Sequence, residues 1–591
     1  MVGCAKDCAR ERVAGYSIQR RMVALIGPLL IATGASSTAQ TSLPPVCEPS
    51  TLGSPYIPVD SWVYPSMLRL YSMGFVDTVY LGLQPWTRSS VGNMLREARG
   101  RIEEADPSPA TNEAEDLFAV LNRELCSEDE DSNLDRPGNA RIESMYSVAR
   151  TISGTPLRDS YHLGSTIVND YGRPCANGFN SYSGLSGYAA AGRFVLYLRG
   201  EFQAAPSAAG YSTELAQALS NVDEIPFFNS TTGLPVNQAT IPLGPIAATA
   251  DARVMEAYLS AQYLDHVVSF GKQDNWLGPA QGGAMAWSNN AENIYTFRID
   301  RIEPLYIPLL SKLVGPFRYE FQVGSLKGHT YPNDPWIHLE KVSFRPTENL
   351  ELGFERAVIW GGEGHEPITL HTFLKSFFSF SGVSSAVKAS RDDPGARFGT
   401  FDFSYRLPFV RNWLTLYSDS QVHDDISPID APRRAAIRPG LYLSHLPGVP
   451  RLDLRAEAAM TDLSITNSQG GLFLLWESIQ RQGYTNKGQL MGDWIGREDK
   501  GGQAWITWHM SGNEWVQASV RHQKAAKDFI AGGTTLNDID FQVVKRVRRD
   551  FEIDGRLQYE RWKAPIYLPG AQTVTNITIQ LTWFPERKVN F

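Results

Sequence analysis

Tryptophan, asparagine and aspartate residues cluster at several places in the middle of the sequence, and together they could bind a sugar. Aromatic rings stack on the CH groups of a sugar, while amide and carboxylate groups hydrogen-bond to its hydroxyls. The candidate residues are Trp276, Asn289, Asn290, Asn333, Asp334, Trp336 and Trp360. The alternative interpretation is structural, because Gly, Pro, Asn and Asp form turns and Trp marks a membrane interface. For any single residue, turn statistics favour the structural interpretation.

A second group of residues has the side chains of a metal site: Glu363, His365, Glu366 and His371. Glycines interrupt this segment, so a solvated loop is the better interpretation. The sequence also lacks a Gly-x-Ser-x-Gly elbow, a His-Glu-x-x-His pair and a glycine-rich phosphate loop. We therefore expect no catalytic activity, no cofactor and no metal.

The elements that would position these residues are strands. Apolar and polar residues alternate with a period of two in residues 194–201, 317–323 and 551–559, among others. Several alternating runs have the length that a tilted strand needs to cross a bilayer, about 9 to 11 residues. Charges occupy one face of nearly every run, which suits a wet lumen, and the apolar face suits lipid. We predict a mainly β fold, a transmembrane antiparallel β-barrel of about 18 strands over residues 145–591.

Charges on the lumen face could close such a barrel. Arg318 and Glu320 share a face, as do Arg455 and Glu457, and such pairs could bridge across the lumen. Aromatic residues near the predicted strand ends, including Trp505, suit the girdle of a membrane interface.

The N-terminal region has a different pattern. Residues 1–39 have the basic, apolar and small-residue order of a signal peptide, with Met1 or Met22 as the start. Residues 45–135 predict three short amphipathic helices in a small bundle. We expect Asp60 to cap the first helix, Thr87 to precede the second, and Ser108 with Pro109 to open the third.

Cysteine content and charge narrow the class of protein further. Cys4 and Cys8 belong to the predicted signal, which leaves Cys47, Cys126 and Cys175. A Cys47–Cys126 disulfide would link the two ends of the helical segment, although the third cysteine could pair with either. The net charge of −8 argues against nucleic-acid binding, because a basic excess is needed to neutralise phosphates.

Several motifs in one order resemble the capsule assembly protein Wzi family. They are residues 59–65, Gly271-Lys272-Gln273 with Trp276-Leu277-Gly278-Pro279, Ser288-Asn289-Asn290-Ala291, Pro332-Asn333-Asp334-Pro335, Trp360-Gly361-Gly362 and Gln558-Tyr559-Glu560-Arg561-Trp562. The resemblance implies an 18-stranded outer-membrane barrel of a Gram-negative bacterium, with a periplasmic helical bundle. It further implies a monomeric, lectin-like protein that holds capsular or exported polysaccharide at the cell surface, in contact with outer-membrane lipid. The segment Ala204–Ala250 is not typical of the family and could be an extracellular loop that changes specificity.

Two alternatives remain open at this stage. A porin-like channel for sugars or oligosaccharides would share the composition and strand pattern of the lectin-like barrel. A closed lumen would distinguish the lectin-like barrel from the channel. A soluble β-rich glycosidase would need two carboxylates about 5 to 9 Å apart in a cleft.

Overall fold

The computed structural model describes residues 43–46, 52–126, 138–380, 383–465, 469–585 and 588–590. The predicted signal peptide and Cys47 lie outside these residues. The compact unit Pro45–Phe591 contains both the N-terminal helices and the strands, so the helical segment is not a separate body.

Eighteen strands of the described chain form one closed antiparallel sheet. They are β1 (Gly138–Ser153), β4 (Gly178–Ala191), β5 (Phe194–Ala205), β6 (Thr249–Tyr263), β7 (His266–Lys272), β8 (Tyr295–Arg301), β9 (Phe317–Ser325), β10 (Trp336–Thr347), β11 (Leu350–Trp360), β12 (Ala396–Arg406), β13 (Leu414–His423), β14 (Ala436–Leu443), β15 (Leu452–Met460), β18 (Asp499–Ser511), β19 (Glu514–Ala525), β20 (Thr534–Arg548), β21 (Phe551–Ala564) and β22 (Leu568–Trp583). Strand β1 closes the barrel by pairing with β22 on one side and β4 on the other. The short strand β23 (Lys588–Asn590) extends the line of β22 along β1. The barrel fold is confirmed, and its first strand begins at Gly138.

The two faces of the barrel wall follow the alternation in the sequence. On β5, Phe194, Leu196 and Leu198 point outward and are 59%, 46% and 50% exposed, while Arg199 and Glu201 point inward and are buried. A wall with apolar side chains outside and polar side chains inside suits a barrel in lipid.

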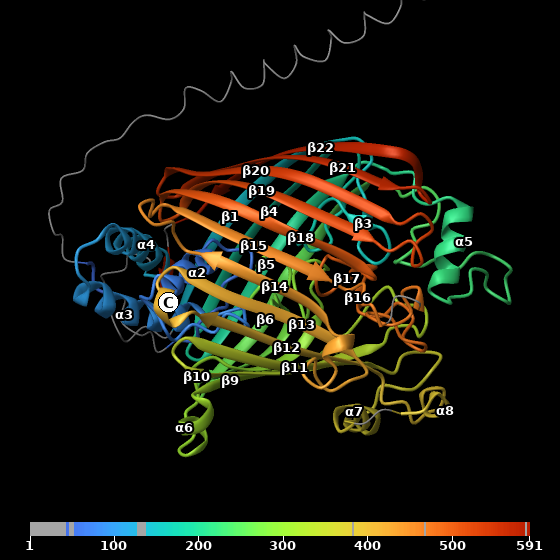
Figure 1. Cartoon of the computed structure of the whole chain (residues 1–591), viewed down its shortest axis with the longest axis horizontal. Helices are drawn as coiled ribbons and strands as arrows, with labels where there is room; N and C mark the ends of the chain where they lie inside the picture. The colour runs from blue at the N-terminus through green and yellow to red at the C-terminus, as the bar shows by residue number, and fades with distance from the viewer. Residues whose placement is uncertain are drawn as a thin grey trace, which may run out of the picture. The chain divides into compact units, whose positions relative to one another are not determined.

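The two ends of the barrel differ in the length of their connections. Five of the connections at one end, the short-turn end, have two residues each, at 192–193, 264–265, 348–349, 512–513 and 549–550. The other end, the long-loop end, has connections such as 206–248 and 361–395. Figure 1 shows α2, α3 and α4 at the short-turn end and α5, α7 and α8 at the long-loop end. In outer-membrane barrels short turns are periplasmic and long loops are extracellular.

The helices have these bounds: α2 (Val63–Ser72), α3 (Arg88–Glu104), α4 (Pro109–Leu125), α5 (Thr213–Val222), α6 (Leu310–Val314), α7 (Leu370–Phe377) and α8 (Ser385–Lys388), with 3₁₀ turns η2 (Pro408–Val410) and η3 (Pro432–Arg434). Thr87 and Ser108 do stand at the starts of α3 and α4, where they are the N-cap residues and accept hydrogen bonds from Ser90 N and Thr111 N. The prediction for Asp60 is wrong: Trp62 is the N-cap residue of α2, without a side-chain hydrogen bond.

Among the described residues, no helix is both long and apolar enough to cross a membrane. Cys126, at the end of α4, is disulfide-bonded. Its predicted partner Cys47 lies outside the described residues, so that pairing stays a prediction. Cys175 is a free, buried cysteine.

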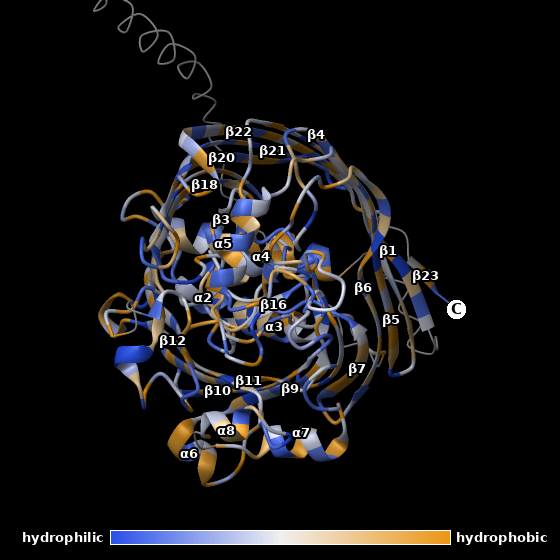
Figure 2. Ribbon diagram, turned by 90° about the vertical axis from the view of Figure 1, so that its right-hand side faces the viewer, coloured by the Kyte–Doolittle hydropathy of each residue, from blue (hydrophilic) through white to orange (hydrophobic). Residues whose placement is uncertain are grey.

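Three of the long-loop connections, which we call the inward segments, fold back into the lumen over the described residues of 154–177, 273–294 and 461–498. They contain the short hairpins β2–β3 (Arg158–Asp159 with Gly164–Ser165) and β16–β17 (Thr485–Asn486 with Gln489–Leu490). Figure 2, which looks along the barrel, shows β3 and β16 inside the ring of strands. These segments pack in one apolar cluster that includes Tyr161, Leu277, Trp287, Leu475 and Trp494. The lumen is therefore filled by a core of its own.

Candidate functional site

A pocket at the long-loop end brings together two segments that the sequence analysis singled out. It has a volume of about 400 Å³ and is lined by Asn333, Asp334 and residues 362–368; we call it the loop-end pocket. The main chains of Asn333 and Glu363 bond in both directions, at N···O distances of 3.0 and 2.7 Å. Asn333 Nδ2 also donates to Glu363 Oε2 at 3.0 Å. The glycines are required here, because a Cβ on Gly362 (φ +115°) would lie 2.9 Å from Asn333 O.

Glu366 gives the loop-end pocket an unusual carboxylate. The side chain is only 2% exposed, and within the described residues its carboxylate oxygens make no well-formed hydrogen bond, although the Gly361 N–H weakly favours the charged form. Burial, with a smaller contribution from Asp393, raises the pKa of Glu366 to about 7. Beside it, His365 Nε2 lies 2.9 Å from Asp393 Oδ2, and this hydrogen bond raises the pKa of His365. A buried carboxyl group without a partner is available to hydrogen-bond a ligand.

The expectation for this segment was therefore right in part. The glycines do make a loop, but Glu366 is buried rather than solvated. In the described ranges, no three His, Cys, Asp or Glu side chains come together in a way that could hold a metal ion.

Two of the predicted tryptophans flank the loop-end pocket. Trp336 and Trp360 pair edge to face across β10 and β11, with ring centroids 6.3 Å apart. Trp336 is 36% exposed, whereas Trp360 is 1% exposed and packs against His338 and Phe373. Both residues adjoin the pocket segments in the chain, but neither ring is part of the pocket lining, and Trp336 lies on the outward face of β10.

The other three predicted residues lie inside the barrel. Trp276 is buried, and its indole N–H donates to Ala280 O at 3.0 Å. Asn290 Nδ2 donates to Leu490 O at 3.0 Å, which ties two inward segments together. Asn289 is buried too, and its Oδ1 has no hydrogen-bond partner among the described residues. The sequence motifs are therefore divided between the loop-end pocket and the lumen.

A larger cavity, the lumen cavity, lies between the N-terminal segment 57–65, the inward segments and the wall from β18 to β22. Its volume is about 580 Å³, and its lining includes Trp276 and Asn289. The lining reaches Trp515 and Phe584, which lie beside the short turns.

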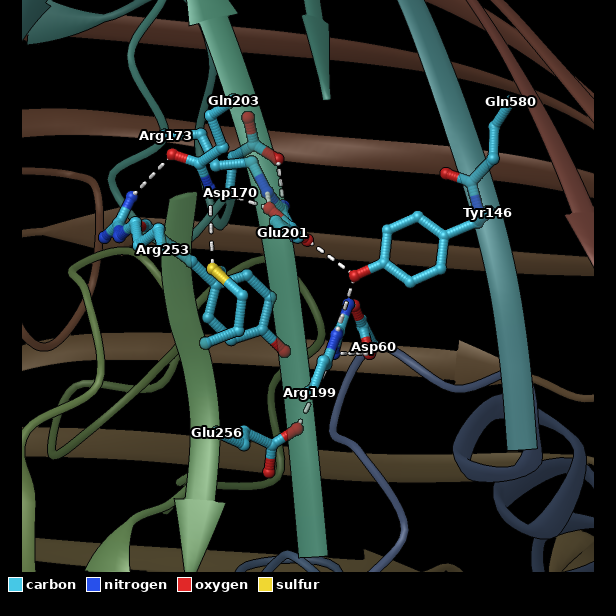
Figure 3. Close-up of polar contacts among 12 residues, drawn as sticks. Asp60, Tyr146, Asp170, Arg173, Arg199, Glu201, Gln203, Arg253, Glu256 and Gln580 are labelled. Carbon is cyan, nitrogen blue, oxygen red and sulfur yellow. Dashed lines mark hydrogen bonds and ion pairs between the residues drawn. The ribbon is translucent and has the colours of Figure 1, made fainter. Parts of the chain in front are cut away.

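One wall of the lumen cavity is a closed set of hydrogen bonds and ion pairs, the lumen network (Figure 3). Arg199 contacts Asp60 at 2.6 Å and donates from Nε to Tyr146 OH at 3.1 Å. Tyr146 OH in turn donates to Glu201 at 2.6 Å. Arg173 adds contacts to Glu201 at 2.6 Å and to Asp170, on the same inward segment, at 2.7 Å. The network binds the N-terminal segment, the inward segment 154–177 and the wall to one another.

Other ion pairs hold the inward segments across the lumen. Arg438 on β14 pairs with Glu457 at 2.9 Å and with Asp493 of an inward segment at 2.7 Å. His162 lies between Asp159 and Asp223, at 3.0 and 2.9 Å. Burial alone would lower the pKa of His162, but the two carboxylates outweigh it and raise the pKa to about 9.

The predicted charge pairs have other partners than expected. Glu320 pairs with Arg298 at 2.6 Å, and Arg318 pairs with Asp300 at 3.4 Å. Glu457 pairs with Arg438 rather than with Arg455. Trp505, expected in the interfacial girdle, is 7% exposed and lines the lumen cavity. Ion pairs do join segments inside the lumen, and Arg318, Glu320 and Glu457 bond to partners other than the residues that share their strand face.

A closed antiparallel barrel with an apolar outer wall and a lumen filled by bonded loops defines the class: a transmembrane β-barrel of the outer-membrane type. The chain belongs to the capsule assembly protein Wzi family, whose sequence profile matches residues 147–576. The predicted family is thereby confirmed.

A solved structure and a curated relative extend this result. The fold is similar to that of Wzi of Escherichia coli, with a TM-score of 0.61 and 16% identity over 89% of this chain and 98% of that one. The Escherichia coli protein is described as an outer-membrane protein involved in group 1 capsule assembly and as a carbohydrate-binding β-barrel. An uncharacterized 55.8 kDa protein in the cps region of Klebsiella pneumoniae is 25% identical over 172 residues. The matched part spans about a third of that protein (33%) and 29% of this chain.

Proposed function

We propose that this protein is a lectin-like outer-membrane barrel that binds capsular or exported polysaccharide and retains it at the cell surface, without catalysis. The observation that carries the proposal is the loop-end pocket, whose polar groups include a buried carboxyl group without a partner. Family membership and the description of the Escherichia coli relative support the same function. Long loops are extracellular in such barrels, so the pocket would face the surface polysaccharide.

The residues of the loop-end pocket suit a hydroxyl-rich ligand. Asp334, Glu363 and Glu366 supply carboxylate acceptors for sugar hydroxyls, and Asn333 supplies an amide. Because three carboxyl groups lie close together, we expect the pocket to prefer neutral or amino sugars over acidic ones.

The filled lumen disfavours the porin-like alternative. Inward segments 154–177, 273–294 and 461–498 occupy the space that a channel would need, and ion pairs such as Arg438–Asp493 fix them to the wall. We propose that the protein works as a monomer, since its barrel is closed within one chain.

The test is polysaccharide binding by the purified, detergent-solubilised protein, with single-channel conductance recorded on the same sample. A panel of purified neutral, amino-sugar and acidic surface polysaccharides serves as probe. E366Q and D334N should weaken binding, and the second change is conservative because Asp334 has a positive φ of 49° that Asn tolerates. D430N changes an exposed loop carboxylate elsewhere and serves as the matched control. Steady conductance without polysaccharide binding would contradict the proposal.

A further inference from the structure

Arg455 on β15 differs from the other arginines that face the lumen. Its side chain is 5% exposed, and within the described residues it makes no hydrogen bond or ion pair that reaches a carboxylate. Its guanidinium instead lies over the rings of Tyr442 and Tyr417, with centroids 4.7 and 5.7 Å away. An unpaired buried charge is costly, so a partner is expected for it.

The carboxylates nearest to Arg455 in the strand are already hydrogen-bonded. Glu457 accepts from Tyr417 OH at 2.7 Å, from Arg438 Nε at 2.9 Å and from two main-chain N–H groups, at 2.8 and 3.0 Å. Asp453 accepts from Tyr442 OH at 3.1 Å and contacts His509 at 2.6 Å. These two carboxylates act on the charge of Arg455, but neither hydrogen-bonds to its guanidinium, whose Nε–H has no acceptor among the described residues.

Arg455 also lines the lumen cavity, next to groups that suit a sugar. Trp505 lies directly opposite Arg455 in the pairing of β15 with β18, and both side chains face inward. Gln503, two residues earlier on β18, also lines the cavity, and its Oε1 has no hydrogen-bond partner among the described residues. A guanidinium, an indole face and a free amide oxygen form one polar and aromatic surface.

The groups at the other end of the lumen cavity are less suited to bind a sugar. Its carboxylates have partners: Asp540 contacts Arg556 at 2.5 Å, and Asp554 accepts from Gln542 at 2.9 Å. The cavity volume of about 580 Å³ falls in the range of small-molecule sites, about 300 to 1,000 Å³.

We propose that the lumen cavity is a second saccharide site, distinct from the loop-end pocket, that binds an acidic sugar. Arg455 binds the carboxylate of the sugar, Trp505 packs on its ring, and Gln503 accepts a hydrogen bond from a hydroxyl. Because the cavity lining reaches Trp515 and Phe584 at the short-turn end, the ligand enters from the side of the N-terminal helices. The loop-end pocket, rich in carboxyl groups, and the lumen cavity thus select saccharides of different charge.

The experiment measures binding of a glucuronate-containing disaccharide to the full-length, detergent-solubilised protein by calorimetry and by tryptophan fluorescence. A neutral disaccharide of the same linkage and inorganic phosphate are the comparison probes. We expect the acidic disaccharide to bind, the neutral one to bind at least about tenfold more weakly, and R455Q to lose about tenfold or more in affinity, as for a lost charged hydrogen bond. R433Q changes an exposed loop arginine and should leave the affinity unchanged.

A stability measurement separates binding from a structural role. Since Arg455 makes no direct bond to a carboxylate, R455Q should lower the unfolding midpoint of the ligand-free protein far less than R438Q does, and should abolish the shift that the acidic disaccharide causes. R455Q protein that is as unstable as R438Q protein would assign Arg455 a structural role and overturn the proposal. Equal affinity for phosphate and the disaccharide would overturn the assignment to a saccharide. E366Q should leave this binding intact, so failure of the loop-end pocket is distinguishable from failure of the lumen cavity.

Discussion

The lumen network and the loop-end pocket use the same residue types in opposite ways. In the network, Arg173 and Arg199 have carboxylate partners at 2.6 to 2.7 Å, and the bonds join segments that are far apart in sequence. In the loop-end pocket, Glu366 is equally buried, yet no described group bonds its oxygens. Buried polar groups that are paired hold a structure together, whereas those left unpaired cost stability and are available to a ligand. The difference separates the part of this molecule that is scaffold from the part that is a candidate site.

The largest effect should follow from breaking the lumen network. R173Q would leave Glu201 and Asp170 without this charged partner inside the barrel, and removing one member of a buried pair costs about 3 to 5 kcal/mol. Urea unfolding of the protein in detergent, followed by tryptophan fluorescence, measures the change. R433Q, on an exposed loop, should stay within about 0.5 kcal/mol of the wild type. If both variants unfold alike, the network does not hold the inward segment.

A second test uses the pH dependence of the paired region. The folded pKa of His162, about 9, lies above its ordinary value near 6.5, so its contribution is fully present below about pH 6.5 and is lost as pH rises through 9. A pKa difference of this size corresponds to about 3 kcal/mol. H162Q should remove this loss of stability, which thermal unfolding between pH 6 and pH 10 would detect. An identical pH profile for the wild type and H162Q would contradict the role of His162 as a charged link.

The stability that depends on Glu366 in the loop-end pocket should change at lower pH than the stability that depends on His162. The pKa of Glu366 is raised from about 4.5 to about 7, so the stability it contributes in the protonated form is lost as pH rises through this range. E366Q should therefore be more stable than the wild type above pH 7, by about 3 kcal/mol at most. The same unfolding series, extended down to pH 4, measures this difference. A gain that persists unchanged at pH 4 would show that the carboxylate charge is not its cause.

The smallest effect should be on binding alone. N333A removes the amide that bonds to Glu363 and should weaken polysaccharide binding about threefold to tenfold, with little change in stability. Binding isotherms on immobilised polysaccharide measure the loss. N229A changes an exposed asparagine in another long loop that also bonds locally, and it should bind like the wild type.

The loop-end pocket is formed by two segments that are about 30 residues apart in the chain. The sequence motif around Asn333 and the segment after Trp360 were both singled out, but their meeting in one pocket depends on main-chain bonds between residues 333 and 363. Glu366 was assigned to a solvated loop because burial of a loop carboxyl group leaves no signal in a local pattern. Asp60 has the residue type of a helix cap, yet its nearest strong partner, Arg199, is 139 residues away.

The barrel, the facing of its wall and the starts of two of the three N-terminal helices could be predicted from the pattern of residues alone. These properties depend on residues two to four positions apart, and local geometry places such residues in fixed relation to one another. Only the tertiary structure decided which lumen charges are paired. Glu457 bonds to Arg438 and to the main chain of residues 281 and 282, while Arg455 is left without a carboxylate. Those choices depend on where inward loops from distant parts of the chain meet the barrel wall, because a buried charge bonds with whatever group the fold brings within about 3 Å.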